Sequence, residues 1–343
     1  MSQTVLDDIS RSRAPVRKRS RFGDVLFRRS SLGVAAGLIA LLGLMVWVLA
    51  QNGDHVLAHF GIHFFTGRSW NPVTETYGAL PFIFGTLVTS AIAIVLAVPV
   101  SVALALLINE VRLGWLRNPL TVLVDLLAAI PSVVYGLWGL FIMVPWFDHT
   151  VEPFLAETVG RIPLLGALFR GNPNGGDLLS AGVILAVMIL PIVTAITREI
   201  IAIVPNELRE AALALGATRY EMIRMSVLPY ARGGIVGATM LGLGRALGET
   251  IAVAMVVGNG LGLGASLLRP GYTIPAVIAN EFREASSIGF HRSALLALAL
   301  TLMAIALVLA AMSRLLVGRT AKLLAGGGTA EGAAAPSALA VSG

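Results

Sequence analysis

Six apolar segments recur along the chain, each long enough to cross a lipid bilayer, whose hydrocarbon core needs about 20 apolar residues of α-helix. The chain of 343 residues is 56% hydrophobic and only 13% charged. A soluble protein with this composition would expose many apolar side chains to water. The sequence therefore predicts an all-α polytopic membrane protein with six transmembrane helices, at residues 32–50, 80–108, 119–145, 178–201, 231–257 and 292–317.

The basic residues are distributed unevenly around these segments. Eight Lys and Arg lie in residues 1–31, which predicts a cytoplasmic N-terminal segment facing anionic lipid. With this start inside, 18 basic residues fall on inner segments, six on outer segments, and Arg245 alone lies within a span. The asymmetry obeys the positive-inside rule and predicts that both termini are cytoplasmic. Because the basic residues lie beside a span, the net charge of +6 indicates a membrane surface rather than nucleic acid.

A cleaved signal peptide is the alternative interpretation of the N-terminus. The apolar stretch 32–50 is longer than the hydrophobic region of a signal peptide, and no convincing cleavage site of small residues follows it. We therefore expect a retained helix, followed by an extracytoplasmic loop at 51–79.

A polar loop at residues 204–230 joins the fourth and fifth predicted spans. Start and stop signals in this loop predict two short helices, each with apolar and charged residues. The first helix is expected to end at a glycine, and the second to begin with a capping box, in which two side chains satisfy each other's free backbone donors. These signals are the Pro205-Asn206 stop and N-cap, Gly216, Thr218 with Glu221, and the terminal Pro229.

Two other interpretations of this loop are open from the residues alone. The run AALALGATRYEMIR is also typical of a DNA-binding helix-turn-helix. About thirty residues between spans, however, cannot build the third helix and core of such a domain. A plain solvated loop is the other interpretation, but it would not need the apolar Ala211, Leu213 and Leu215 beside its charges.

The loop resembles the cytoplasmic EAA loop of ABC-importer permeases, in which Glu-Ala-Ala is followed by a glycine and, further on, by an apolar residue and proline. Downstream, the run Arg245-Ala246-Leu247-Gly248-Glu249-Thr250 narrows the resemblance to the PstC-type permeases of phosphate importers. The resemblance implies that the loop couples the chain to an ATPase. The coupling residues that it implies are Glu210, Ala211, Ala212, Gly216, Leu228 and Pro229.

Further stretches extend the resemblance over most of the chain. They include Trp70-Asn71-Pro72 with Tyr77-Gly78-Ala79-Leu80-Pro81, the run Ile130-Pro131-Ser132-Val133-Val134-Tyr135-Gly136, and Ile278-Ala279-Asn280-Glu281-Phe282. The implied fold is a type I ABC-importer permease domain (MetI-like) at residues 80–317, preceded by one extra N-terminal helix. The implied partners are a second, PstA-type permease, a cytoplasmic ATPase dimer and an external phosphate-binding protein. The tail at 318–343 is low in complexity and is predicted to be disordered.

Candidate residues for a substrate pathway lie where polar groups interrupt the spans. Arg245 and Glu249, at i and i+4, are predicted to share one helix, and a lone cation within a span is costly unless it is paired or faces a polar cavity. A purely structural ion pair is the alternative. Asp125 lies inside another span that Pro131 is expected to kink toward a polar interior, and Ser132 and Tyr135 follow it. For these residues, helix packing and bending is the alternative.

No catalytic constellation is found in the sequence. It contains no Walker motif and no Ser/His/Asp grouping, so we expect a transport subunit without enzyme activity or a cofactor of its own. ATP and Mg²⁺ would be used by the partner ATPase. There is no cysteine, and although His55, His59 and His63 could lie on one helix face and bind zinc, we expect them to be solvated.

Other functions within and outside the family stay open. Permeases for sulfate or molybdate share the EAA loop, and only the patterns at 125–136 and 245–250 indicate phosphate. A secondary transporter or channel with an ion relay at Arg245 and Glu249 is the alternative from another class. The absence of a detectable inverted repeat argues against it. Small-xxx-small pairs at Gly233/Gly237 and Gly244/Gly248 predict a face that meets the second permease.

Overall fold

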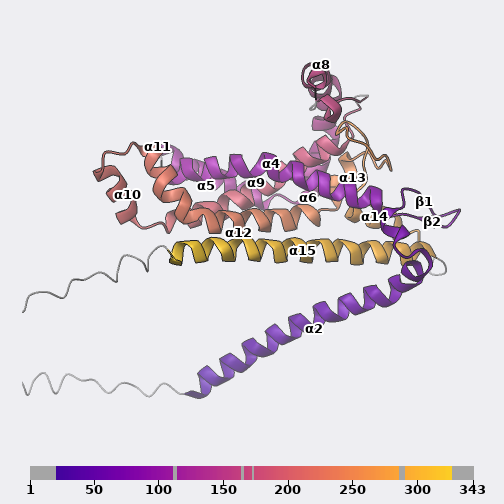
Figure 1. Cartoon of the computed structure of the whole chain (residues 1–343), viewed down its shortest axis with the longest axis horizontal. Helices are drawn as coiled ribbons and strands as arrows, with labels where there is room; N and C mark the ends of the chain where they lie inside the picture. Colours follow the sequence, from indigo (N-terminus) through magenta and orange to yellow (C-terminus); the bar gives the residue numbers. More distant parts are fainter. Residues whose placement is uncertain (1–20, 111–113, 164–165, 172–173, 286–289, 327–343) are drawn as a thin grey trace, which may run out of the picture. The chain divides into compact units, whose positions relative to one another are not determined.

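The computed structural model describes residues 21–110, 114–163, 166–171, 174–285 and 290–326, and its described part is mostly α-helical (Figure 1). The chain divides into two units, Met1–Gln51 and Asn52–Gly343. Most of helix α2 (Arg21–Phe60) belongs to the first unit. The helix is longer than the predicted span 32–50 at both ends. Most of the predicted basic segment and of the predicted disordered tail, residues 1–20 and 327–343, lies outside the described residues.

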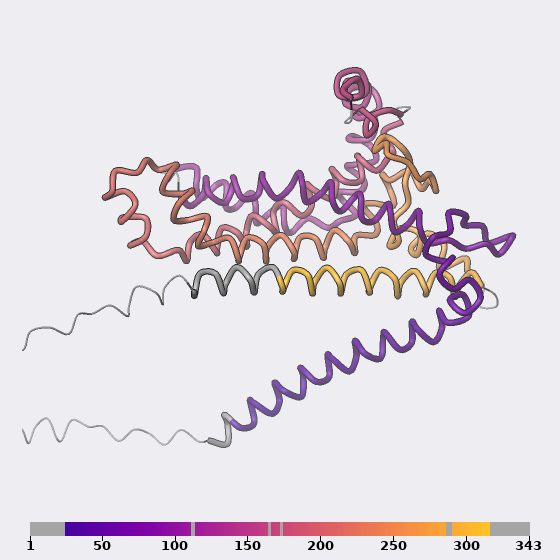
Figure 2. The backbone as a smooth tube through the Cα atoms, in the orientation of Figure 1, coloured from indigo at the N-terminus to yellow at the C-terminus, as the bar shows by residue number. Residues whose placement is uncertain are grey.

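The second unit contains the end of α2 and all later elements (Figure 2). A short antiparallel hairpin pairs Trp70 with Tyr77. The elements in chain order are α3 (His63–Thr66), β1 (Trp70–Asn71), β2 (Thr76–Tyr77), α4 (Leu80–Glu110), α5 (Gly114–Ala129), α6 (Ser132–Trp138), the π-turn η1 (Gly139–Met143), α7 (Val144–Trp146), the π-turn η2 (Phe147–Val151), α8 (Glu152–Thr158), the 3-10 turns η3 (Val159–Arg161) and η4 (Gly166–Leu168), α9 (Leu178–Ala202), α10 (Asn206–Ala214), α11 (Arg219–Met222), the π-turn η5 (Ile223–Val227), α12 (Leu228–Leu247), α13 (Ile251–Val256), α14 (Ile274–Glu281) and α15 (Phe290–Gly326).

Four helices in the described part of the chain are long and apolar enough to cross a membrane, namely α2, α4, α9 and α15. A fifth span is possible if α5 and the segment Ser132–Arg161, bent by 94° at a short break, form one span. The multi-pass class is therefore confirmed, whereas the count of six is not. The expected span 231–257 is interrupted: α12 ends at Leu247 and α13 starts at Ile251.

Helix α9 is the most buried of the four spanning helices, because α4 and α12 both pack along it. Close approach is possible where one helix presents a glycine to a branched side chain of the next. A Cβ at Gly182 would meet Ile92 of α4 at 2.5 Å, and a Cβ at Gly242 of α12 would meet Val193 at 2.7 Å. These three helices therefore form a closely packed bundle, which extends from the hairpin end to the α10 end (Figure 1).

The hairpin end of the second unit has its own apolar cluster. Trp70, Tyr77 and Phe82 pack there with residues of α14 and α15. The Trp70 indole N–H also donates a hydrogen bond to Glu281 at 2.8 Å. Helix α14 begins after its N-cap Thr273, ends at Glu281 and buries its first turn in this cluster.

Candidate functional site

The loop predicted to couple to an ATPase folds as the two helices α10 and α11 at one end of the bundle (Figure 1). Gly216 has a φ of +85°, as expected of a glycine that ends a helix. The backbone N–H of Gly216 donates to Leu213 O at 3.0 Å, and that of Ala217 donates to Ala212 O at 3.2 Å. These two bonds form a Schellman motif, which turns the chain sharply between α10 and α11.

The predicted capping box of α11 is confirmed. The Thr218 hydroxyl accepts a hydrogen bond from the Glu221 backbone, and the Glu221 carboxylate accepts one from the Thr218 backbone N–H at 2.7 Å. That backbone bond, together with a bond from the Thr218 hydroxyl, lowers the pKa of Glu221. The box therefore stays ionised and intact near neutral pH.

Two of the predicted helix boundaries in this loop are wrong. Pro205, not Asn206, is the N-cap of α10, and the Asn206 side chain instead accepts a hydrogen bond from Arg209 at 3.1 Å. Pro229 does not end the second helix, because α11 continues through a π-turn into α12 and Pro229 lies in the first turn of α12. The helix passes through Pro229 directly after the π-turn, where the regular hydrogen-bond ladder is already interrupted.

The EAA-like residues differ in how far they are exposed. Glu210 and Ala211 are exposed, Ala212 is buried, and Leu228 and Pro229 are half-buried. Beside them is a groove of about 570 Å³, whose lining includes Leu208, Ala211, Leu215, Gly216 and Met225. Leu215 is 90% exposed and Tyr220 is 69% exposed. A concave surface with exposed apolar residues and a rim of charge is typical of a site that receives another protein.

The sequence gives no sign of the contact that anchors this loop to α4. Arg209 of α10 donates two hydrogen bonds to one carboxylate oxygen of Glu110, from Nε at 3.1 Å and from Nη2 at 2.9 Å. The two residues are 99 positions apart, so no local spacing could indicate the pair.

Two breaks in the helices meet in the middle of the second unit. One separates α5 from α6 at Ile130 and Pro131, and the other separates α12 from α13 at residues 248–250. Helix α6 packs on α13, because a Cβ at Gly136 would lie 2.9 Å from the Ala252 Cα. The kink expected at Pro131 is a bend of 94° between α5 and the segment that follows it.

Tyr135 lies directly after the first of these breaks, and Arg245 lies in the last turn of the helix before the second. The Tyr135 hydroxyl donates a hydrogen bond to Leu127 O at 2.8 Å, across the bend, and the Arg245 guanidinium acts electrostatically on it. Ser132 is half-buried at the start of α6. Asp125 lies elsewhere, exposed, with Arg198 of α9 at 3.8 Å from its carboxylate. Tyr135 is therefore within electrostatic range of Arg245, whereas Asp125 is paired with Arg198.

Arg245 and Glu249 do not form the predicted i, i+4 pair on one helix. Arg245 is exposed in the last turn of α12, whereas Glu249 lies beyond the helix end and is buried. The Glu249 carboxylate accepts a weak bond from the Ala252 backbone N–H at 3.4 Å. Among the described residues, no ion pair joins the two side chains. The cause is the helix break at Gly248, which removes the helical geometry that the prediction assumed.

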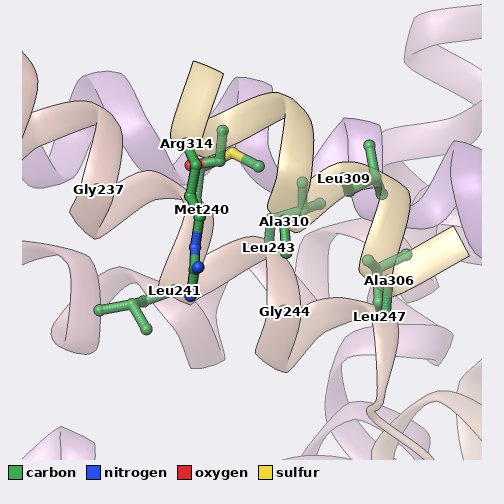
Figure 3. A pocket seen from close by; sticks show the side chains of 11 residues that line it. Gly237, Met240, Leu241, Leu243, Gly244, Leu247, Ala306, Leu309, Ala310 and Arg314 are labelled. Carbon is green, nitrogen blue, oxygen red and sulfur yellow. The ribbon is translucent and has the colours of Figure 1, made fainter. Parts of the chain in front are cut away.

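A groove of about 250 Å³ runs between α12 and α15 (Figure 3). Gly237 and Gly244 line it, and a Cβ on either would meet no atom within 4 Å. Ala306 and Ala310 face them from α15, and Arg314 lies at one end of the groove. Because these small residues form part of its lining, another helix could approach this surface closely.

Comparison with known proteins shows which family has this architecture. The family model described as "binding-protein-dependent transport system inner membrane component" matches residues 97–322. The chain belongs to this family. The matched range contains α10, α11 and every predicted pathway residue, so both candidate sites of the permease lie within the family's shared domain.

Curated relatives of this permease match most of its length. The phosphate transport system permease protein PstC of Xylella fastidiosa is 46% identical over 84% of this chain and 88% of its own. PstC proteins of Pasteurella multocida and Mesorhizobium japonicum are 44% and 43% identical, over 87% and 92% of this chain and 93% and 97% of their own.

Two solved ABC transporters share the permease fold. A chain of a bacterial alginate ABC transporter, in complex with a pentasaccharide-bound periplasmic protein, has a TM-score of 0.53 at 18% identity, over 83% of this chain and 93% of that chain. A chain of the inward-facing MetNI methionine ABC transporter has a TM-score of 0.50 at 19% identity, over 71% and 94%. These likenesses concern the fold alone.

Proposed function

We propose that this permease is the membrane subunit of an ATP-driven importer that carries inorganic phosphate across the cytoplasmic membrane. The observation that supports this most is the α10–α11 loop, which presents an EAA-like sequence at an exposed groove on a rigidly capped turn. The relatives at 43–46% identity are phosphate permeases by name. The chain itself performs no hydrolysis, and ATP and Mg²⁺ are bound by a separate ATPase subunit.

The partners follow from the surfaces that the fold offers. A cytoplasmic ATPase dimer occupies the α10–α11 groove, a PstA-type permease packs on the glycine-lined face of α12, and an external phosphate-binding protein docks at the hairpin end. The distribution of basic residues supports a topology with both termini and the α10–α11 loop in the cytoplasm. The extra N-terminal helix, 32–50, is a sixth span in this topology.

The phosphate pathway passes the two helix breaks. Arg245 offers planar N–H donors to phosphate oxygens there, and Tyr135, within its electrostatic range, lies on the same helix as Ser132. Glu249, buried in the adjoining break, keeps the net positive charge low, so that the anion is released rather than trapped. Asp125 has a structural role in this proposal, because it pairs with Arg198 of α9 rather than with the anion.

Reconstitution of the purified complex tests the function. ATP hydrolysis should be stimulated by the binding protein loaded with phosphate, and phosphate uptake should accompany it. The same assay with sulfate- and molybdate-binding proteins distinguishes a permease for another oxyanion. Retention of an ATPase subunit in mild detergent separates the proposal from a secondary transporter or channel, because such a protein would transport alone.

A further inference from the structure

The helix α10 is held to α4 by a side chain that makes contacts in three directions. Arg209 donates to Glu110 through Nε and Nη2, to Ile201 O through Nη2 at 2.9 Å, and to Val204 O and Asn206 Oδ1 through Nη1. Its side chain is 15% exposed and that of Glu110 is 7% exposed. Since a planar guanidinium holds its donors in a rigid fork, these contacts together leave Arg209 little freedom.

The loop contacts α4, which is remote from it in sequence, through residues at the C-terminal end of α4. Helix α10 follows α9 after a short turn, and α11 continues into α12, so the backbone itself transmits movement of the loop to α9 and α12. Helix α4 has no such direct backbone link to the loop. Its end contacts the loop through the Arg209–Glu110 pair, through Arg219 Nη1 on Glu110 O at 3.2 Å, and through an apolar cluster containing Ala105 and Ala212.

We propose that the Arg209–Glu110 ion pair positions the loop, so that movement of α10 is transmitted to α4 together with α9 and α12. The inference rests on the proposed function, in which an ATPase moves α10. An apolar cluster has no preferred direction and can slide, whereas a forked ion pair fixes both distance and orientation. Arg209 and Glu110 are therefore positioning residues for coupling, and they touch neither phosphate nor nucleotide.

The test measures phosphate transported per ATP hydrolysed in the reconstituted complex. Glu110→Gln and Arg209→Gln each leave one buried charge unpaired, so we expect the ratio to fall by about tenfold or more while hydrolysis continues. The charge swap Glu110→Arg with Arg209→Glu should recover part of it. Two matched controls remove exposed charges nearby: Glu199→Gln at the same end of α9, and Arg224→Gln on η5. Both controls should keep the parent ratio.

A covalent bridge provides an independent variant, because the chain contains no cysteine. Glu110→Cys with Arg209→Cys, joined by a reducible bifunctional thiol reagent, should transport with a near-parent ratio when bridged and lose it on reduction. A bridged complex as uncoupled as the reduced one would overturn the inference, as would single variants with the parent ratio. Failure of every variant to assemble would also overturn it, because the pair would then be needed for folding. If the parent complex retains no ATPase, the proposed function fails instead.

Discussion

Glu152 and Asp177 bury two carboxyl groups beside each other ahead of α9. The Glu152 carboxylate accepts hydrogen bonds from the backbone N–H groups of Asn174 and Gly175, and Asp177 accepts one from Ser180 at 2.7 Å. Burial, opposed by the hydrogen bonds from Ser180 and assisted by the charge of Glu152, raises the pKa of Asp177 to about 7. A proton shared by the two groups satisfies oxygens that otherwise lack a donor.

This raised pKa predicts the direction in which stability changes with pH. An unfolded Asp titrates near 3.9, about three units below the native value, so between these values the folded protein binds more protons than the unfolded chain. The proton-linked stability is complete below pH 4 and is lost as the pH rises through about 7. The apparent Tm in detergent should therefore fall by about 5 °C from pH 5 to pH 8 through this group.

Asp177→Asn should remove that pH dependence, because the amide needs no proton. Glu157→Gln, on the same helix as Glu152 but exposed, serves as its control and should keep the dependence. A full pH dependence in Asp177→Asn would contradict the assignment.

Arg245 allows a second prediction at the residue scale. It is exposed at the end of α12 and Glu249 is buried in the break, so the two positions are not equivalent. Arg245→Gln should assemble into the complex but lose phosphate uptake and stimulated hydrolysis. Arg245→Lys, which keeps the charge but not the planar donors, should retain only part of both.

The charge swap Arg245→Glu with Glu249→Arg should also fail, because it moves the guanidinium into a buried position. Full recovery of uptake by the swap would show that the two residues serve as a structural pair.

At the scale of elements, the turn between α10 and α11 depends on one backbone conformation. A Cβ at Gly216 would meet no atom within 4 Å, so the cost of a side chain there comes from its φ of +85° alone. For a β-branched residue we expect about 1 kcal/mol or more. Gly216→Val should therefore reorient α10 and uncouple hydrolysis from uptake in an inserted protein. Gly216→Asn is the control, since asparagine tolerates this conformation. Normal coupling in Gly216→Val would contradict the proposed role of the turn.

The α12–α15 groove predicts an assembly surface. Gly237→Leu and Gly244→Leu fill open space in this chain, so the isolated subunit should fold normally. A partner helix that approaches closely would clash with the new side chains, and we expect much less of the second permease to co-purify. Gly114→Leu, also in open space but outside the groove, should assemble like the parent. Equal assembly and transport by all three variants would indicate that the groove faces lipid.

At the scale of the whole second unit, the candidate surfaces lie at separate places along one bundle. The α10–α11 loop lies at one end, the hairpin cluster at the other, and the two helix breaks between them (Figures 1 and 2). Helices α4, α9 and α12 connect these levels. A movement at the loop can therefore reach the breaks along these packed helices.

Single cysteines test the orientation of this bundle, because the parent chain has none. Val73 in the hairpin and Leu215 in the loop are 91% and 90% exposed, which makes them matched positions. Cysteine at Val73 should react with an impermeant thiol reagent added outside intact cells. Cysteine at Leu215 should react only after the membrane is opened. The reverse pattern would contradict the topology derived from basic residues.

The sequence alone predicted what depends on local chemistry. Apolar length indicated a multi-pass membrane protein, and backbone rules placed the turn at Gly216 and the capping box at Thr218 and Glu221. The EAA-like residues and the other motifs that resemble phosphate permeases could also be recognised in the sequence, because each is a short continuous pattern. Each of these features involves residues within a few positions of one another, where spacing determines geometry.

Only the tertiary structure decided what depends on contacts between distant residues. It paired Arg209 with Glu110 across 99 positions, placed Tyr135 within electrostatic range of Arg245, and buried Glu152 against Asp177. It also broke the helix between Arg245 and Glu249, where apolar length had indicated a continuous span. Helix α13 packs against α6 after that break. The local sequence cannot predict this, because the two helices are more than 100 residues apart.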